Sequence, residues 1–560
     1  MTNCALTILS GTTANGGAGI TFNTSTGSGS AAVQVNHDAS QVTFQINDSL
    51  GRTVMSGQLK GPSATNPSEV LNWTCISHDN MVSINGYGSV QEIRTIDMDG
   101  NITRNRVDAG GRTLESEDML GNIAKSVYKA DGRMVKSIDA MTKETTYAYD
   151  DLGRQTSSTN PLSATTSQSY DAAGNVVSQT DAKSNSASSE YDVLGRMISQ
   201  TDRTNTTTTY AYNLNGQRTL QTDGETKATA WAYNAIGQRT SMTYSDTGVQ
   251  SATYNPAGAV LTQTLPSGRV HVYTVDSFRG LVTQADYKNT VGTITNTETF
   301  AYDALARKTS SASSQYLVSL GNAFDDYGRL SSESTTYAGQ TYTVAYGYNT
   351  KGQRQSITYP SGDVAGYTYD DRGQLDTLAW ESTQLEDHSY NANGLLTSID
   401  RAFEDETRVY DDASQLTSIS STNTGSMTYT YDDNGNVLGE TLSGVMAPYS
   451  FTTEKAGAGT YPDGYDDEDR FMRYIRTGVS EDYLLDRSGI GNISSANLNG
   501  SSTSRMYNDV HAMTSLGASS QSYDSDGNAT TLHTGVTLDW DDAGRVQATQ
   551  RIQRGQGAPG

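Results

Sequence analysis

The sequence predicts an all-β protein in which hairpin repeats of about 21 residues form one long antiparallel sheet. This sheet is expected to curl into a spiralling shell, complete or incomplete, like a β-cocoon or barrel. Three observations predict the fold. A motif of the form Tyr-[Asp/Asn]-x-x-Gly-[Arg/Asn/Gln] recurs along most of the chain. The segments between motifs alternate with period two and are rich in Thr and Tyr, which favour strands. No stretch of about 10–12 residues shows a helical period.

The repeat keeps a constant step over its best-preserved stretch. A second turn, often Thr-Asp as at Thr180 and Asp181, lies about half a period after each tyrosine, so one strand plus one turn, about 10.5 residues, is the physical unit. A decayed copy begins at Val275, the motif resumes between Tyr302 and Tyr431, and later copies begin at Tyr507, Tyr523 and Trp540. Starting points 21 residues apart are Tyr128, Tyr149, Tyr170, Tyr191, Tyr212, Tyr233 and Tyr254.

The motif residues have separate roles in the predicted turn. Asp or Asn caps its own backbone, and Gly supplies the positive φ that the turn requires. Paired tyrosines such as Tyr210 and Tyr212 share one face, and we expect them to stack into ladders across adjacent strands, with Arg or Gln against the rings. We assign the following positions to the repeat itself, and none to catalysis, cofactor binding or metal ligation: Tyr149, Asp150, Gly153, Arg154, Tyr170, Asp171, Gly174, Tyr191, Asp192, Gly195, Arg196, Tyr212, Gly216, Tyr233, Gly237, Tyr369, Asp370, Gly373, Tyr431, Asp432 and Gly435.

The repeat divides the chain into five segments. About 43 strands with a spacing of about 4.8 Å would form a ribbon roughly 200 Å wide, and open sheets rarely exceed about ten strands, so the ribbon must curl. Its diameter would be roughly 65 Å if rolled once and about half that as a two-turn spiral. We expect an N-terminal β cap or degenerate repeats over 1–90, the shell over 91–440, an interrupted repeat or loop insertion over 441–505, terminal repeats over 506–550 and a disordered tail over 551–560.

Composition excludes several function classes. The net charge of −24 disfavours nucleic acid as a partner. No window approaches 18 apolar residues, so this chain is not expected to insert into a membrane. Met1 to Leu9 lacks the features of a Sec-type signal peptide, but the composition permits an extracellular or bacterial cell-surface location; either export uses another route or the true N-terminus lies upstream. Cys4 and Cys75 are either two unlinked thiols or one disulfide.

The Tyr-Asp-x-x-Gly-Arg unit at a 21-residue step resembles the YD repeats of Rhs proteins, Tc-toxin B/C subunits and teneurins. The resemblance covers about 80% of the chain and implies a spiralling β-shell. In toxin members such a shell encloses an unfolded cytotoxic polypeptide, and in teneurins it presents an adhesion surface. The implied partner is therefore a toxin polypeptide cargo or a cell-surface glycan or protein. No Asp precedes any proline, so the Asp-Pro self-cleavage core of toxin members is absent here, and a truncated product, a short shell or one part of a two-part shell are all open.

Acidic motifs are the best cation candidates in the sequence. Residues 97–101 and 524–528 both read Asp-x-Asp-Gly-Asn, like the start of an EF-hand loop, but Asp108 and Gly535 stand where the bidentate Glu would be. Ordinary repeat turns explain them better. The cluster 463–469 is a slightly stronger candidate, with a solvated loop as the alternative. The six histidines are not paired at ligand spacing, so a zinc site is not expected, and no cofactor is predicted.

Catalytic motifs are absent from the sequence. It has no Gly-x-Ser-x-Gly elbow, phosphate loop or dinucleotide fingerprint. Arg269, His271 and Tyr273 share one strand face and could form a lyase-like group, but an ordinary strand explains them better. We therefore expect a structural shell that encapsulates a toxin-type cargo or mediates cell-surface contact. We expect it not to be an enzyme. The alternative is a carbohydrate-binding or polysaccharide-degrading protein that uses the concave face of the sheet.

Overall fold

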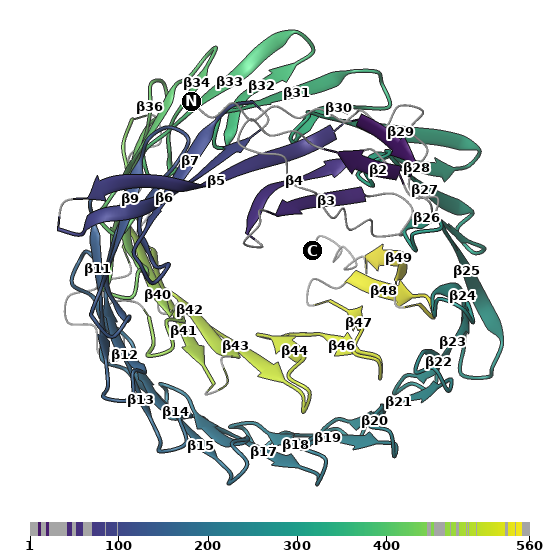
Figure 1. Ribbon diagram of the computed structural model, residues 1–560. Coiled ribbons are helices and arrows are strands. Elements are labelled where there is room, and N and C mark those ends of the chain that lie inside the picture. Colours follow the sequence, from purple (N-terminus) through teal and green to yellow (C-terminus); the bar gives the residue numbers. More distant parts are fainter. Residues whose placement is uncertain are drawn as a thin grey trace.

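The computed structural model describes a chain of strands and turns, arranged as a ring when viewed along its axis (Figure 1). No α-helix occurs in the described part of the chain, and none there could cross a membrane. The residues described are 9–12, 18–21, 42–47, 52–59, 70–84, 86–97, 99–444, 450–452, 465–470, 472–477, 481–488, 490, 492–499, 501–532, 536–543 and 545–551.

The strands are short and follow one another at regular intervals. Their bounds are β1 (Leu9–Thr12), β2 (Ala18–Thr21), β3 (Val42–Asn47), β4 (Thr53–Leu59), β5 (Val70–Ile84), β6 (Gly88–Asp97), β7 (Ile102–Val107), β8 (Thr113–Glu117), β9 (Ile123–Tyr128), β10 (Met134–Ile138), β11 (Glu144–Tyr149), β12 (Gln155–Thr159), β13 (Thr165–Tyr170), β14 (Val176–Thr180), β15 (Ser186–Tyr191), β16 (Met197–Thr201), β17 (Thr207–Tyr212), β18 (Arg218–Thr222), β19 (Ala228–Tyr233), β20 (Arg239–Thr243), β21 (Val249–Tyr254), β22 (Val260–Thr264), β23 (Val270–Val275), β24 (Val282–Lys288), β25 (Ile294–Tyr302), β26 (Lys308–Ser313), β27 (Val318–Phe324), β28 (Leu330–Tyr337), β29 (Gln340–Tyr348), β30 (Arg354–Thr358), β31 (Val364–Tyr369), β32 (Leu375–Trp380), β33 (Thr383–Tyr390), β34 (Leu396–Arg401), β35 (Glu406–Tyr410), β36 (Leu416–Ser421), β37 (Gly425–Tyr431), β38 (Val437–Leu442), β39 (Ser450–Thr452), β40 (Arg473–Thr477), β41 (Glu481–Arg487), β42 (Ile493–Leu498), β43 (Ser501–Tyr507), β44 (Met513–Leu516), β45 (Ser519–Ser520), β46 (Ser522–Tyr523), β47 (Ala529–Thr531), β48 (Val536–Trp540) and β49 (Val546–Arg551).

The strands form one continuous antiparallel ribbon. Consecutive strands pair with each other from β3 to β45. No described pairing joins β45 back to β3, so the long sheet curls without closing through a backbone ladder. Strands β1 and β2 form a separate hairpin, and β46 to β49 form a separate four-stranded sheet. The prediction of an all-β sheet curled into a spiralling shell is confirmed.

The turn after each repeat tyrosine is a five-residue loop with a bulge. In the turn 150–154, the Gly153 N–H donates to the Asp150 carbonyl at 3.0 Å, and the Asp150 N–H donates to the Arg154 carbonyl at 3.0 Å. The Asp150 side chain accepts the Arg154 N–H at 2.9 Å. Glycine occupies the position of positive φ, for example 84° at Gly153, and the strand register shifts at Tyr149. This is the loop expected of a type I turn followed by a left-handed residue.

The tyrosine hydroxyl explains why the repeat uses tyrosine rather than phenylalanine. The Tyr149 hydroxyl donates to the Met134 carbonyl at 2.7 Å, and the Tyr212 hydroxyl donates to the Met197 carbonyl at 2.7 Å. Each accepting carbonyl lies directly after the preceding turn, next to the bulge, where the strand ladder is interrupted. The tyrosine of one repeat therefore satisfies a backbone group of the repeat before it.

The expected ladders of stacked tyrosines are not formed, and this prediction was wrong. Among the described residues no two tyrosine rings are in contact, because strands alternate: Tyr147 pairs with Ser158, and Ser158 pairs with Thr166. Tyrosines on this face are thus two strands, about 9.6 Å, apart, beyond ring contact. Arginine fills the gap, with the guanidinium of Arg154 at 4.5 Å from the ring centre of Tyr170 and that of Arg196 at 4.8 Å from Tyr212.

The wall has almost no hydrophobic interior. Among the described residues the buried apolar side chains are Val90, Val107, Leu114, Ala285, Ala365, Ile399, Met472 and Ala496. A single curved sheet has no second layer against which to pack, so its stability must come from the backbone ladder and from contacts between neighbouring repeats.

Candidate functional site: a charged seam between two coils

The alternating turns place two kinds of edge on the ribbon. We call the edge with the turns that follow the repeat tyrosines, such as 150–154, the tyrosine edge. The edge with the alternate turns, such as 139–143, is the opposite edge. Side-chain contacts join the opposite edge of residues 97–317, the first coil, to the tyrosine edge of residues 349–545, which belongs to the second coil. We call this line of contacts the seam.

The seam is a series of turn-to-turn polar contacts. Along the chain, Lys351 lies 2.9 Å from Asp99, Lys143 lies 2.5 Å from Asp412, and Lys183 lies 3.2 Å from Asp432. Every contact joins a turn of the first coil to a turn of the second, so the seam is continuous. Further members of the same series are Asn393 to Asp139, Asn434 to Asp181, Arg203 to Asp469, His511 to Asp223, Lys227 to Asp509, Ser267 to Asp526 and Tyr316 to Asp541.

The spacing of these contacts gives the size of one coil. The Ala182 N–H donates to the Asn434 side-chain oxygen at 3.0 Å, and these residues are 252 apart in sequence, which is twelve steps of 21. Twelve repeats contain about 24 strands, so the circumference is about 115 Å and the diameter about 37 Å. This agrees with the two-turn spiral expected from the sequence.

The charge pattern of the turns differs between docked and free stretches of the tyrosine edge. In the free turns of the first coil, Asp150 pairs with Arg154 at 2.7 Å and Asp192 pairs with Arg196 at 2.5 Å, within the same turn. In the docked turn 432–436 an asparagine stands in place of that arginine, and the Asp432 carboxylate takes Lys183 of the first coil as its cation. Both stretches have exceptions, because the docked turns 466–470 and 541–545 keep the arginine and the free turn 171–175 has an asparagine.

Each acidic motif considered as a cation site receives a basic side chain instead. Lys351 lies 3.2 Å from Asp97 in the first Asp-x-Asp-Gly-Asn turn. Arg269 occupies the second, 524–528. Arg203 contacts the turn 466–470, while 461–464 lies outside the described residues. Among the described residues no group of His, Cys, Asp and Glu is arranged to hold a metal ion.

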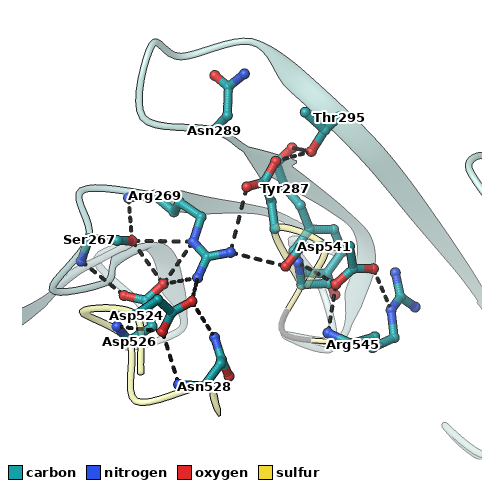
Figure 2. A network of polar contacts seen from close by, with 12 residues as sticks. Ser267, Arg269, Tyr287, Asn289, Thr295, Asp524, Asp526, Asn528, Asp541 and Arg545 are labelled. Carbon is teal, nitrogen blue, oxygen red and sulfur yellow. Dashed lines mark hydrogen bonds and ion pairs between the residues drawn. The ribbon is translucent and has the colours of Figure 1, made fainter. Parts of the chain in front are cut away.

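Arg269 forms the densest part of the seam (Figure 2). Its guanidinium donates to Asp526 at 2.7 Å, to Asp524 at 3.0 Å and to the Asp541 carbonyl at 3.0 Å. The side chain of Arg269 is only 10% exposed and that of Asp526 only 5%. Because β46–β49 is not paired with the long sheet, these contacts fasten it to the wall.

Burial and hydrogen bonding act in opposite directions on the seam carboxylates. Burial alone would raise the pKa of Asp181, but the hydrogen bonds from the Asn185 N–H, Arg203 and Asn434 outweigh it, and the pKa is lowered. Burial likewise opposes the lowered pKa of Asp541, and the Arg545 N–H, the Tyr316 hydroxyl and the Arg545 side chain prevail. Both groups are therefore ionised at neutral pH.

The residues considered for a lyase-like group have structural contacts. Arg269 binds the acidic turn, and the His271 ring nitrogen lies 2.8 Å from the Asp542 carbonyl oxygen. The Tyr273 hydroxyl donates to Gln263 at 3.3 Å, and burial raises its pKa. Arg269 and His271 thus belong to the seam. The cysteine pairing lies outside what the structure describes, since Cys4 and the Cys75 side chain are not described.

The sequence-assigned repeat positions all lie at the tyrosine edge. Tyr149 and its equivalents end strands, and the Asp, Gly and Arg positions that follow build the turns. Those of the first coil line the free stretch, and 370–373 and 432–435 lie in the docked stretch. Sequence reasoning missed the seam itself. A partial signal was present, because several docked turns have Gln or Asn rather than Arg at the fifth position, as at Gln374 and Asn436, although 466–470 and 541–545 keep Arg.

Comparison with known proteins agrees with this geometry. The RHS Repeat family model matches residues 128–165, 149–186 and 191–228. The sequence has no match among curated proteins. The crystal structure of TcdB2-TccC3 superposes with a TM-score of 0.69 at 14% identity, covering 92% of this chain and 34% of that chain.

Two further solved structures share the fold. TcdB2-TccC3-TEV gives a TM-score of 0.61 at 13% identity and covers 92% of this chain and 36% of that one. TcdB2-TccC3 without its hypervariable C-terminal region gives 0.56 at 12% identity, covering 93% and 29%. The chain thus spans about a third of the length of these structures. The chain therefore contains RHS repeats within residues 128–228, and its sheet shares the fold of the TcdB2-TccC3 structures.

Proposed function

We propose that this chain forms the wall of a shell that encloses a polypeptide cargo of the polymorphic-toxin type. The observation that carries the proposal is the seam, because contacts between residues 252 apart turn an open ribbon into a continuous wall. A ring about 37 Å across is wide enough for an unfolded chain. The likeness to TcdB2-TccC3 supports the same role, and the resemblance to exported toxin proteins supports an extracellular site of action.

Protection of a reporter from protease tests this function. An unfolded segment carrying one protease site would be fused after Gly560, and its cleavage rate measured in the full chain. We expect cleavage at least about tenfold slower than in a variant whose seam is weakened by Lys183→Ala with Arg203→Ala. Cleavage of the reporter at equal rates in both proteins, with both still folded by circular dichroism, would contradict enclosure.

Saccharide binding is the second candidate, and one observation favours it. A cavity of about 400 Å³ lies over β12–β16 and is lined by hydroxyl and amide side chains, including Gln168, Gln179 and Gln200, with Asp181 and Arg203 at the seam. Such groups suit sugar hydroxyls, although no aromatic ring lines this cavity. Binding on a glycan array that Gln179→Ala and Gln200→Ala abolish would support this role, and silence of the array would exclude it.

A further inference from the structure

The turn tips of the tyrosine edge change character between docked and free stretches. We define the tip as the second and third residues of each five-residue turn. Docked tips are polar or charged, such as Lys351, Asn393, Asp412 and Asn434. Several free tips of the first coil carry large apolar side chains that are open to solvent, beside polar tip residues such as Asp151 and Asn215; their exposures are 75% at Leu152, 102% at Val193, 72% at Leu194, 104% at Leu214, 74% at Ile236 and 95% at Phe278.

The opposite edge of the second coil is the other free edge, and it also carries exposed apolar side chains. Phe403 lies in a turn of this edge and is 91% exposed. Tyr337, Trp380 and Leu498 end strands at this edge and are 59%, 40% and 42% exposed. Tyr359 and Trp380 lie on neighbouring turns with ring centres 5.5 Å apart. Aromatic side chains therefore line one free edge, and mainly aliphatic side chains line the other.

In several turns of the free tyrosine edge the first Asp is paired with an arginine of the same turn. In the Asp150–Arg154 and Asp192–Arg196 pairs the carboxylate has its cation within the same turn, whereas Asp432 of the docked stretch takes Lys183 of the other coil. An apolar surface with self-neutralised charges can be buried at low electrostatic cost. Monomeric proteins rarely expose rows of large apolar side chains of this kind.

We propose that the two free edges bind each other between copies of this chain. The opposite edge of the second coil of one copy would lie on the tyrosine edge of the first coil of the next. The seam supports a second copy as the binding partner. Within one chain, the seam already joins an opposite edge to a tyrosine edge in the same way. Turns on both free edges recur every two strands, about 9.6 Å, so their tips can interdigitate along the edge.

The contact is long enough for a stable interface. A coil edge of about 115 Å readily supplies the roughly 800 Å² per partner of a standard interface. Because the two edges differ, the contact is head-to-tail, and each added copy leaves one edge of each kind free. This inference rests on the fold alone and does not depend on the proposed cargo.

Sedimentation of the full chain over a wide range of concentration tests the inference. One variant carries Leu194→Asp with Leu214→Asp on the tyrosine edge, and the other carries Phe403→Asp on the opposite edge. We expect wild type to self-associate and each variant alone to associate at least about tenfold more weakly. Val409→Asp, at a residue that is 55% exposed on β35 away from both free edges, is the matched control and should associate like wild type.

Mixing the two variants gives the decisive result. Each retains the edge that the other has lost, so a head-to-tail contact predicts a one-to-one complex in the mixture although neither variant associates alone. Wild type that stays monomeric throughout, a mixture without complex, or association unaffected by both variants would overturn the proposal. The tips are open to solvent, so the variants should melt at the same temperature as wild type. If the acidic variant of the tyrosine edge does not, Leu194→Ser with Leu214→Ser replaces it.

Discussion

Replacing Arg269 with Met should release the last four strands from the wall. Arg269 is 10% exposed and holds Asp526, which is 5% exposed, together with Asp524. Removing one partner of a buried ion pair costs about 3–5 kcal/mol, and Asp524, 26% exposed, regains some water, so we expect about 2–4 kcal/mol here. The separate sheet β46–β49 depends on these contacts, whereas distant strands contact mainly their neighbours.

Amide hydrogen exchange measures this loss strand by strand. A cost of 2–4 kcal/mol corresponds to exchange about 30- to 900-fold faster in β46–β49, with β15–β17 unchanged. Arg239→Met, at an exposed arginine on β20, is the control and should leave both regions unchanged. Adding Asp526→Asn to Arg269→Met should recover part of the loss by removing a buried unpaired carboxylate. Unchanged exchange in β46–β49, or a loss spread evenly over the wall, would refute the role given to Arg269.

Three further predictions concern the repeat and its seam. Tyr212→Phe should cost about 1–2 kcal/mol, measured as faster local exchange, because the Met197 carbonyl loses its donor, and an unchanged rate would contradict the assignment. Gly195→Val should lower the melting temperature, because φ is 75° there, whereas Thr142→Gly, at a φ of 67°, should not; equal effects would argue against backbone strain. The pKa of Asp181 lies below its ordinary 3.8, so its contribution to stability is complete above that value and is lost as the pH falls through the lower folded pKa; seam contacts that are already lost above pH 3.8, by light scattering and exchange, would oppose this.

The local structure could be predicted from the sequence because each repeat contains the residues that determine its own strands and turn. The constant 21-residue step specifies strand length, and Asp with Gly specifies the turn, as at Asp150 and Gly153. The curl also followed, since so many strands cannot form an open sheet. The prediction of tyrosine ladders failed because the repeat places tyrosine only on every second strand. On the strand between, Ser158 takes the position opposite Tyr147, so successive tyrosines do not meet.

Long-range structure was harder to predict, because the seam joins turns that are adjacent only after a full coil. Its register depends on how many strands one coil holds, and strand twist and tilt set that number rather than any local motif. The acidic motifs at 97–101 and 524–528 were therefore weighed as calcium loops. Their actual cations, Lys351 and Arg269, lie more than 250 residues away in sequence.

The fifth residue of the turn connects the local repeat with the long-range seam. With Arg there, as at Arg154, the turn neutralises its own Asp and stacks on the next tyrosine, Tyr170. With Asn there, as at Asn436, Asp432 has no arginine in its own turn, and Lys183 reaches it from another coil. The backbone of the two turns is the same, so this exchange moves the cation of the carboxylate from its own turn to another coil. Side chains at the turns can thus join two coils while every strand keeps the same local fold, and the exposed apolar tips of the free tyrosine edge are available to another surface.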